Sequence, residues 1–367
     1  MKKVFTYFVE PASYTLDLIT NVYSKLDISF VFIKSTSEAK SKQIIKKDVC
    51  LDERSLYQKI AFVYNIWKNN KLIIINGYNN YPFILNFIFN FFSFNKKYLA
   101  TESDTQLKVP NNIFKRMVKT VYLNIIFRNK YVLGFAGGSF THKQLFRFYG
   151  MKEERIFLIP MMVDNSKYLK AYKRKPKKFT FLFVGRLINS KNVNLLCERF
   201  LSSFNNKNAA LIIVGSGINL EKYKQKYTHH QIIFTGSLFG DELLNYYKNS
   251  SVFVFPSTQE EWGLVINEAM SSGLPVIAHK NVGSVHDLIL KKNTGFIIES
   301  WDELELKMNE LYSNPKLCDE FSKNAVRLME KEWNYKLYND NLIRSIKPSS
   351  SKSSSAWRTA MRLAEHN

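Results

Sequence analysis

The sequence predicts an α/β protein with two domains, each a doubly wound parallel sheet covered by helices. From Lys178 onward, short apolar runs of strand type alternate with helical patterns, and the first half repeats this alternation less regularly. Continuous apolar strands between helices are typical of parallel sheets that are buried on both faces. The 367 residues, 46% of them hydrophobic, also exceed the size of one ordinary single-core domain.

The predicted strands follow one another along the chain. In the first half they read VFTYFV, ISFVFI, LIIING, KKYLATE and VLGFAG, and in the second FTFLFVG, ALIIVG, IIFTG, SVFVFPS, PVIAH and GFIIE. The cluster YKRKPKK between the halves has the composition of a linker. We therefore predict a first domain at 1–165, a linker at 166–178, a second domain at 179–330, a C-terminal helix at 331–346 that packs back toward the first domain, and a disordered tail at 347–367 whose Ser-rich composition leaves its native origin open.

Composition narrows the classes of partner. The chain has 53 Lys and Arg residues against 31 Asp and Glu, so its net charge of +22 attracts nucleic acid, anionic lipid or phosphorylated small molecules. Three scattered cysteines favour reduced thiols in the cytoplasm. The N-terminal apolar run meets Glu10 and Pro11, which favours a strand over a signal peptide. The apolar run at 83–94 is shorter than the ~20 residues of a spanning helix, which leaves a peripheral membrane contact open.

Residues that follow the strands of a parallel sheet are the ones expected to meet a ligand. After the first strand of the second half come Gly185, Arg186 and then Lys191, and two cations there suit a diphosphate. Ordinary surface salt bridges are the alternative. VGSGINL, after the next strand, lacks the third glycine of a dinucleotide-binding motif, so Gly215 and Gly217 indicate a tight turn.

The stretch PSTQEEWGLVINEAMSSGLPVI opens a helix with two carboxylates around it, Glu260 and Glu268. Gly263 allows close approach of the backbone to a ligand, and free N–H groups at a helix start favour an anion. An ionised carboxylate accepts hydrogen bonds from neighbouring hydroxyl groups. A phosphate on the amides and sugar hydroxyls on the acids together describe one ligand.

Four motifs occur in a fixed order, FVGRLINSKN, IIVGSG, FTGSL and the stretch in which seven residues separate Glu260 from Glu268. In this order and spacing, roughly 165–346 resembles the retaining glycosyltransferases of family 4, which have the GT-B fold. The first half is similar only in general layout. The resemblance implies two Rossmann-like domains facing an interdomain cleft, with an NDP-sugar held mainly by the C-terminal domain and an acceptor mainly by the N-terminal one.

The resemblance also implies roles for single residues. Arg186 and Lys191 would stabilise the departing diphosphate, and Glu260 would contact the transferred sugar. Glu268 would hold the ribose hydroxyls. The expected donor-binding set, which includes backbone amides, is Gly185, Gly236, Trp262, Gly263, Leu264, Val265 and Glu268. No metal or other cofactor is expected, and the chain has no DxD motif.

The chain departs from the family pattern at several points. Asn192 stands where a glycine commonly follows the lysine, and FVEPASYTLD replaces a Gly-rich loop near the N-terminus. Relatives often have a histidine where KYLATESDT offers Glu102, which suits a sugar or acceptor contact. Helix capping by Ser103 and Asp104 is the alternative there. The pair Gly137 and Gly138 would line the N-domain side of the cleft or form only a turn.

These inferences predict a cytoplasmic, NDP-sugar-dependent retaining glycosyltransferase acting on a saccharide or lipid-linked saccharide of lipopolysaccharide O-antigen or capsule. The basic segment FKRMVKTVYLNIIFRNK and the run at 83–94 favour a peripheral contact with the anionic cytoplasmic face of the inner membrane. A sugar-nucleotide epimerase or hydrolase of the same fold is the first alternative. A nucleic-acid-binding protein is disfavoured because most aromatic residues lie in periodic apolar runs that indicate core.

Overall fold

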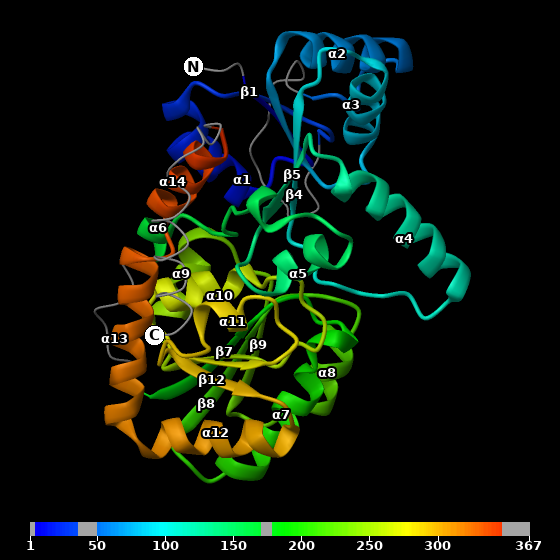
Figure 1. Ribbon diagram of the computed structural model, residues 1–367. Coiled ribbons are helices and arrows are strands. Elements are labelled where there is room, and N and C mark those ends of the chain that lie inside the picture. The colour runs from blue at the N-terminus through cyan, green and yellow to red at the C-terminus, as the bar shows by residue number, and fades with distance from the viewer. Residues whose placement is uncertain (1–3, 36–49, 170–177, 347–367) are drawn as a thin grey trace.

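The computed structural model describes residues 4–35, 50–169 and 178–346 and contains two six-stranded parallel sheets. Each sheet carries helices on its faces, and one domain lies above the other in Figure 1. The α/β class with two doubly wound domains is therefore confirmed. The proposed tail at 347–367 and most of the proposed linker lie outside the described residues.

The N-terminal sheet has the order β2-β1-β3-β4-β5-β6. Its strands are β1 (Val4–Phe8), β2 (Ser29–Phe32), β3 (Leu72–Asn76), β4 (Tyr98–Ser103), β5 (Val132–Ala136) and β6 (Ile156–Leu158). All five residues of β1 are buried, as expected for a strand covered on both faces. Phe5 faces one side of the sheet, towards Phe62, while Phe8 faces the other, towards Tyr23.

Helices cover both faces of this sheet. They are α1 (Ser13–Leu18), η1 (Ile19–Tyr23), η2 (Ser24–Leu26), α2 (Leu56–Asn69), α3 (Tyr81–Phe92), α4 (Ile113–Arg128), α5 (Thr141–Phe148) and η4 (Glu153–Arg155). The helix α6 (Asn165–Leu169) follows and packs on the C-terminal domain. Local chemistry explains two of the starts. Ser55 and Gln58 form a capping box before α2, and the Asn112 side chain accepts the Lys115 N–H at the start of α4. None of the helices within the described ranges is long and apolar enough to cross a membrane.

The C-terminal sheet has the order β12-β11-β10-β7-β8-β9. Its strands are β7 (Phe179–Val184), β8 (Ala209–Val214), β9 (Ile232–Gly236), β10 (Val252–Phe255), β11 (Val276–His279) and β12 (Gly295–Ile298). The helical elements are η5 (Asn189–Lys191), α7 (Val193–Phe204), α8 (Leu220–Lys226), α9 (Gly240–Lys248), α10 (Leu264–Ser271), α11 (Val285–Leu288), α12 (Trp301–Ser313), α13 (Pro315–Lys331) and α14 (Tyr335–Ile346).

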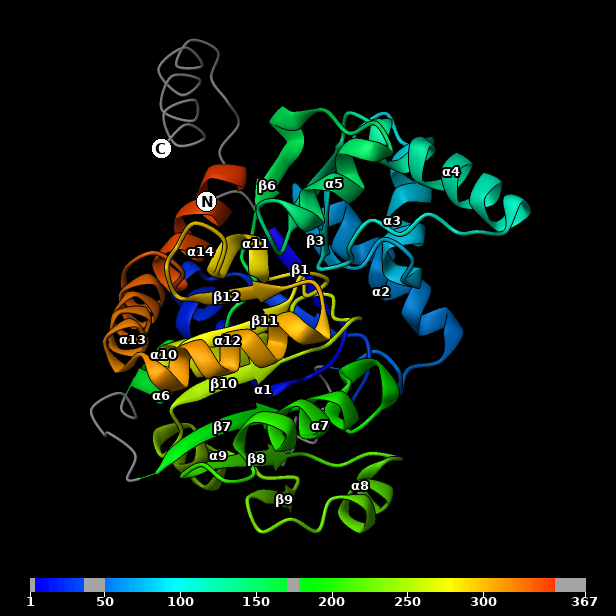
Figure 2. The same cartoon turned by 90° about the horizontal axis from the view of Figure 1, so that it is seen from below.

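Side chains of the central strands divide between the two faces of this sheet. Phe181 packs on Phe204 of α7, with ring centroids 5.1 Å apart, and α12 lies beside α7 on that face (Figure 2). Phe253 of the neighbouring strand packs on Tyr247 of α9, with ring centroids 6.1 Å apart. This two-sided burial directs the polar residues of the domain to the loops at the strand ends.

The chain passes from the N-terminal to the C-terminal domain near α6, and its last helix, α14, returns to the N-terminal domain. The Tyr338 hydroxyl of α14 lies 3.1 Å from that of Tyr23 in the N-terminal domain. Asn165 of α6 donates to the carbonyls of Met329 and Trp333, and Trp333 Nε1 donates to the Met161 carbonyl. The two crossings of the chain are therefore bonded to each other.

The N-terminal half of α4 extends away from the body of the N-terminal domain (Figure 1). We call residues 107–121 the α4 arm. Its exposed apolar side chains are Val109, Ile113, Phe114, Met117, Val118 and Val121. Lys119 Nζ donates to the Lys108 carbonyl and so joins the helix to the segment that precedes it.

Candidate functional site

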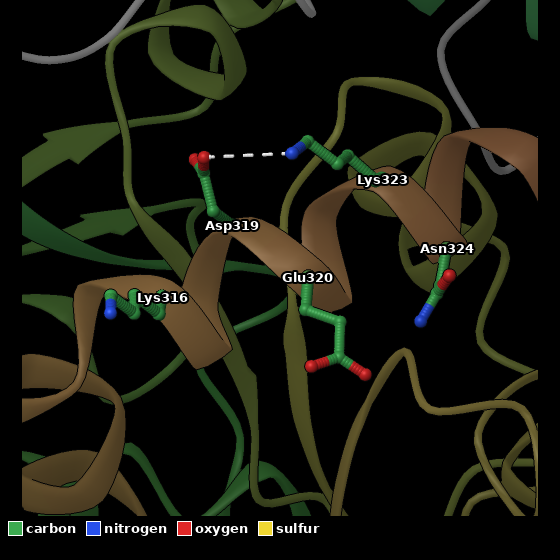
Figure 3. A pocket seen from close by; sticks show the side chains of 5 residues that line it. All are labelled: Lys316, Asp319, Glu320, Lys323 and Asn324. Atoms are coloured by element: carbon green, nitrogen blue, oxygen red, sulfur yellow. Dashed lines mark ion pairs between the residues drawn. The ribbon is translucent and has the colours of Figure 1, made fainter.

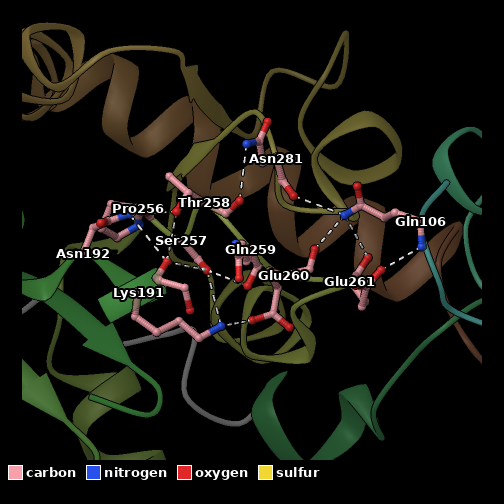
Figure 4. A network of polar contacts seen from close by, with 11 residues as sticks. Gln106, Lys191, Asn192, Pro256, Ser257, Thr258, Gln259, Glu260, Glu261 and Asn281 are labelled. Carbon is pink, nitrogen blue, oxygen red and sulfur yellow. Dashed lines mark hydrogen bonds and ion pairs between the residues drawn. The ribbon is translucent and has the colours of Figure 1, made fainter. Parts of the chain in front are cut away.

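A largely buried ion pair at the strand ends of the C-terminal sheet joins Lys191 to Glu260. Lys191 ends the 3₁₀ turn η5, and its Nζ forms an ion pair with Glu260 and lies 3.3 Å from Ser257 Oγ (Figure 4). The lysine side chain is 8% exposed and that of Glu260 24%, so solvent screens this pair only partly. Two of the three residues expected to act on the reacting groups are thus in contact.

Asn192 takes the backbone conformation for which relatives commonly use a glycine after the lysine. Its φ of 53° lies in the left-handed region, which glycine and asparagine tolerate best. Its side-chain amide donates to the Pro256 carbonyl at 3.0 Å and to Thr258 Oγ1 at 3.2 Å. The side chain therefore anchors the Lys191 turn to the loop that carries Glu260, in addition to opening a helix.

Arg186 follows β7, and its side chain is exposed. Beside it, Gly185 and Gly215 approach so closely that a Cβ on Gly215 would lie 1.9 Å from the Gly185 carbonyl oxygen. Gly217, likewise, would meet the Leu187 backbone. The tight-turn interpretation of both glycines agrees with this geometry, and the turn leaves the Arg186 side chain facing solvent.

The start of α10 offers backbone donors. Gly263 is the residue before the helix, with φ of 93°, and no side chain caps the helix there. A Cβ on Gly263 would lie 3.3 Å from Glu260 Cγ, so the small residue permits the Glu260 side chain to pass. The amides of Gly263, Leu264 and Val265 therefore face the same loop as the Lys191 pair and suit an anion.

The Trp262 side chain is buried, although the residue stands next to Gly263 at the start of α10. The side chain is 2% exposed and stacks on Trp333, with centroids 5.4 Å apart, and its Nε1 donates to Asn267 Oδ1. On the N-domain side a Cβ on Gly138 would meet its ring at 2.7 Å. Its indole therefore packs between the domains, and only its backbone faces the α10 start.

Glu268 lies one turn inside α10 and is half-buried. Tyr247 Oη donates to its Oε2 at 2.8 Å, and the Tyr168 hydroxyl lies close to the same carboxyl. Burial raises the pKa of Glu268, and the two tyrosine hydroxyls lower it again. Gly236, at the end of β9, has φ of 78° and open space where a side chain would be, which leaves room for a flat group such as a base.

On the N-terminal side, Glu102 ends β4 with its carboxyl enclosed by protein. Burial, and then the charge of Asp104, raise the pKa of Glu102 to about 8. The Asn76 amide lies 3.0 Å from its Oε2. The capping alternative for Ser103 and Asp104 is wrong, because the next helix begins at Ile113 and Asn112 caps it.

Gly137 and Gly138 belong to an interdomain contact. Next to them the Ser139 amide and hydroxyl donate to Asp287 of α11, and burial raises the pKa of that carboxyl. His142 Nε2 donates to the Glu261 carbonyl at 2.8 Å. The glycines therefore form more than a turn, and they let the N-terminal domain contact the loop that carries Glu260.

Sequence reasoning missed the residues that join the domains. Gln106 is the main one (Figure 4). Its backbone N–H donates to the Glu261 carboxylate, and its side-chain amide donates to the carbonyls of Glu260 and Asn281. Lys108 pairs with the same carboxylate. The acidic Glu261, directly after Glu260, was the available signal. A hollow on α13 lined by Lys316, Asp319, Glu320, Lys323 and Asn324 (Figure 3) lies on one helix away from the strand ends, and we assign it no role.

The fold defines the class of protein. The crystal structure of the Anabaena protein HepE in complex with UDP-glucose superposes with a TM-score of 0.71, covering 94% of this chain and 99% of that one at 17% identity. The chain thus has the GT-B fold of glycosyltransferase structures, as predicted.

The family follows from the sequence of the second half. Residues 164–327 match the family described as Glycosyl transferases group 1, so the chain carries a domain of this family, and the resemblance is confirmed. Sulfoquinovosyl transferase SQD2 of Arabidopsis thaliana is 38% identical over 133 residues, 35% of this chain and 25% of that protein. An Escherichia coli UDP-Gal:alpha-D-GlcNAc-diphosphoundecaprenol alpha-1,3-galactosyltransferase is 29% identical over 191 residues, 47% of this chain and 48% of that protein. The chain thus matches between a quarter and a half of the length of these two relatives.

Proposed function

We propose that the protein is a retaining glycosyltransferase that moves a sugar from an NDP-sugar to a saccharide or lipid-linked saccharide. The pair of Lys191 and Glu260 carries this proposal, together with the amides that open α10 and the exposed Arg186 after strand β7. Its position within the matched family domain, at the strand ends of a parallel sheet, supports it further. The likeness to the galactosyltransferase supports a lipid-linked acceptor. We propose lipopolysaccharide or capsule synthesis as the setting of this reaction.

In the proposed reaction, the bond between the anomeric carbon and the diphosphate oxygen breaks while the acceptor oxygen attacks from the same face. The diphosphate gains negative charge, and the acceptor proton passes to its released oxygen. Lys191 and Arg186 stabilise that charge together with the α10 amides. Glu260 holds Lys191 in place and contacts the transferred sugar. Because these cations belong to the chain itself, we propose that no metal is required.

The other wall of the donor site has a separate role in the proposal. Glu102 carries a proton near neutral pH and so donates a hydrogen bond to a sugar hydroxyl, whereas Glu268 stays an acceptor for the ribose. A sugar-nucleotide epimerase or hydrolase is the competing activity. It would consume the donor in the absence of any acceptor, which a coupled assay for released nucleotide detects.

Nucleotide binding tests the donor site directly. We expect one of UDP-, GDP-, dTDP- or CMP-sugars to raise the melting temperature selectively, without acceptor or metal, and calorimetry to show one site. In Glu268→Ala this response is lost. Equal stabilisation of wild type and variant would contradict the assignment, and Glu330→Ala on the outer face of α13 serves as the control.

We further propose that the α4 arm contacts the anionic cytoplasmic face of a membrane. Phe114, Val118 and Val121 recur at helical spacing with exposed side chains, and Lys115, Arg116 and Lys119 flank them. The sequence contains no Asp or Glu between Thr105 and Lys152. Exposed apolar groups beside such uniformly positive charge complement an anionic bilayer.

Vesicle co-sedimentation tests this contact. We expect binding to vesicles with anionic headgroups that weakens with salt, and a loss of at least tenfold in Phe114→Glu. The matched control is Leu306→Glu on α12, which introduces the same charge at a side chain that is 60% exposed. Binding that ignores lipid charge, or equal loss in both variants, would contradict the proposal.

A further inference from the structure

The carboxylate of Glu268 is held by two phenols that come from separate elements. Tyr247 lies on α9 and is fully buried, and Tyr168 lies on α6 and is half-buried. The rings meet edge to face at 5.9 Å with planes 87° apart. Tyr247 donates at 2.8 Å, and Tyr168 contacts the same carboxylate. Two directions therefore fix the orientation of the acid.

The count of hydrogen-bond positions makes this arrangement suitable for a diol. An ionised carboxylate has about four acceptor positions, and the phenols occupy at most two of them. The positions that remain match the two hydroxyls of a ribose. Burial raises the pKa of both phenols, so they remain protonated donors near neutral pH.

The phenols also differ from the usual partners of a buried acid. Elsewhere in the site, Lys191 supplies a positive charge to Glu260. The pKa of Glu268 is set by its burial and by the two tyrosine hydroxyls. Besides Glu268 itself, the acids Asp17 and Asp164 raise the pKa of Tyr168. Neutral donors orient this carboxylate without pairing it with a cation that would compete for the nucleotide phosphates.

Tyr168 adds a connection to the rest of the chain. The preceding residue of α6, Lys167, donates to both carboxylate oxygens of Asp17 on α1 at 2.6 Å. Asn165, at the other end of α6, accepts from Ser271 Oγ of α10 at 3.1 Å. The helix that orients Glu268 is therefore fastened to both domains.

We propose that Tyr168 and Tyr247 are positioning residues for the donor nucleotide, which hold Glu268 so that its free acceptor positions face the ribose hydroxyls. The inference rests on the proposed function, since Glu268 must be the ribose contact. A purely structural alternative is that Glu268 only satisfies the buried Tyr247 hydroxyl.

Tyr168→Phe tests the proposal, because it removes one hydroxyl from a half-buried ring. We expect the affinity for UDP or GDP, whichever binds the wild type better, to fall roughly tenfold near pH 7, as for a lost hydrogen bond to a charged group. Tyr246→Phe on α9 is the matched control and keeps wild-type affinity. Calorimetry on the full chain measures both.

The pH profile separates positioning from structure. Without the Tyr168 hydroxyl the pKa of Glu268 rises further, so nucleotide affinity in Tyr168→Phe begins to fall at a higher pH than in wild type and recovers toward pH 9. A pH-independent loss, or no loss, would overturn the inference. Unchanged affinity in Glu268→Gln would instead contradict the proposed function. Because Tyr247→Phe opens a fully buried site, its melting temperature is measured before its affinity is compared.

Discussion

The strand ends of the two sheets have the same architecture and opposite electrostatics. At the C-terminal sheet, the acid Glu260 is paired with Lys191, and Arg186 adds a second, exposed cation after strand β7. At the N-terminal sheet, Glu102 and Asp104 repel each other, and burial raises the pKa of both. Under the proposed function, the paired cations of the C-terminal edge suit phosphate, and the protonated acid of the N-terminal edge suits neutral hydroxyl groups.

The largest expected effect comes from removing the cation on the C-terminal side. We expect Lys191→Ala to lower kcat about 100-fold or more, as when a preorganised group that stabilises transition-state charge is lost. Nucleotide affinity changes less, because the charge on the diphosphate grows only during transfer. Steady-state kinetics with the donor found by the binding screen measure this. Lys316→Ala on α13 is the control. Equal activity of the two variants would contradict the role of Lys191 in stabilising the diphosphate.

A second prediction concerns the acid on the N-terminal side. The pKa of Glu102 is raised from 4.5 to about 8, so the folded protein keeps a proton that the unfolded chain has lost. Stability therefore falls as pH rises between these values, by up to about 1.4 kcal/mol per pH unit, and levels off above pH 8. We expect Glu102→Gln to flatten this slope in urea unfolding from pH 5 to 8. An unchanged slope would mean that this carboxyl titrates normally.

A third prediction addresses the contact between the two edges. In Gly138→Ala the added Cβ would lie 2.7 Å from the Trp262 ring and 3.1 Å from Asp287. We expect a loss of about 1–3 kcal/mol in the free energy of unfolding, because an overpacked site must shift its neighbours. Chemical denaturation measures it. Gly240→Ala, where a Cβ would meet open space, is the comparison for backbone strain alone.

The smallest expected effect is at the rim of the same contact. Lys108 and Glu261 form an ion pair with side chains that are 59% and 36% exposed. Lys108→Gln should change stability by less than about 1 kcal/mol, because solvent and salt screen such pairs. Gln106→Ala should cost more, since it leaves the Glu260 and Asn281 carbonyls without this donor. Equal losses of stability in the two variants would show that the Lys108–Glu261 ion pair contributes as much as the Gln106 side-chain hydrogen bonds.

Local patterns were sufficient for much of the fold and of the C-terminal site. The strands are continuous apolar runs, and Lys191 and Glu260 follow strands directly, so topology alone brings them together. Tyr168 and Tyr247 could not be found in this way, because they approach Glu268 from elements that are distant in sequence. The interdomain role of the Trp262 ring depends on Gly138 and Trp333, which belong to other parts of the chain.

The two crossings between the domains determine how the molecule can move. The chain passes from one domain to the other near Asn165 and returns near Trp333, and the Asn165 side chain bonds the two passages together. Two passages that are bonded to each other restrain the relative motion of the two domains. We expect the sheets to rotate about an axis through these two passages, so that opening of the proposed donor site would separate Gln106 from Glu261.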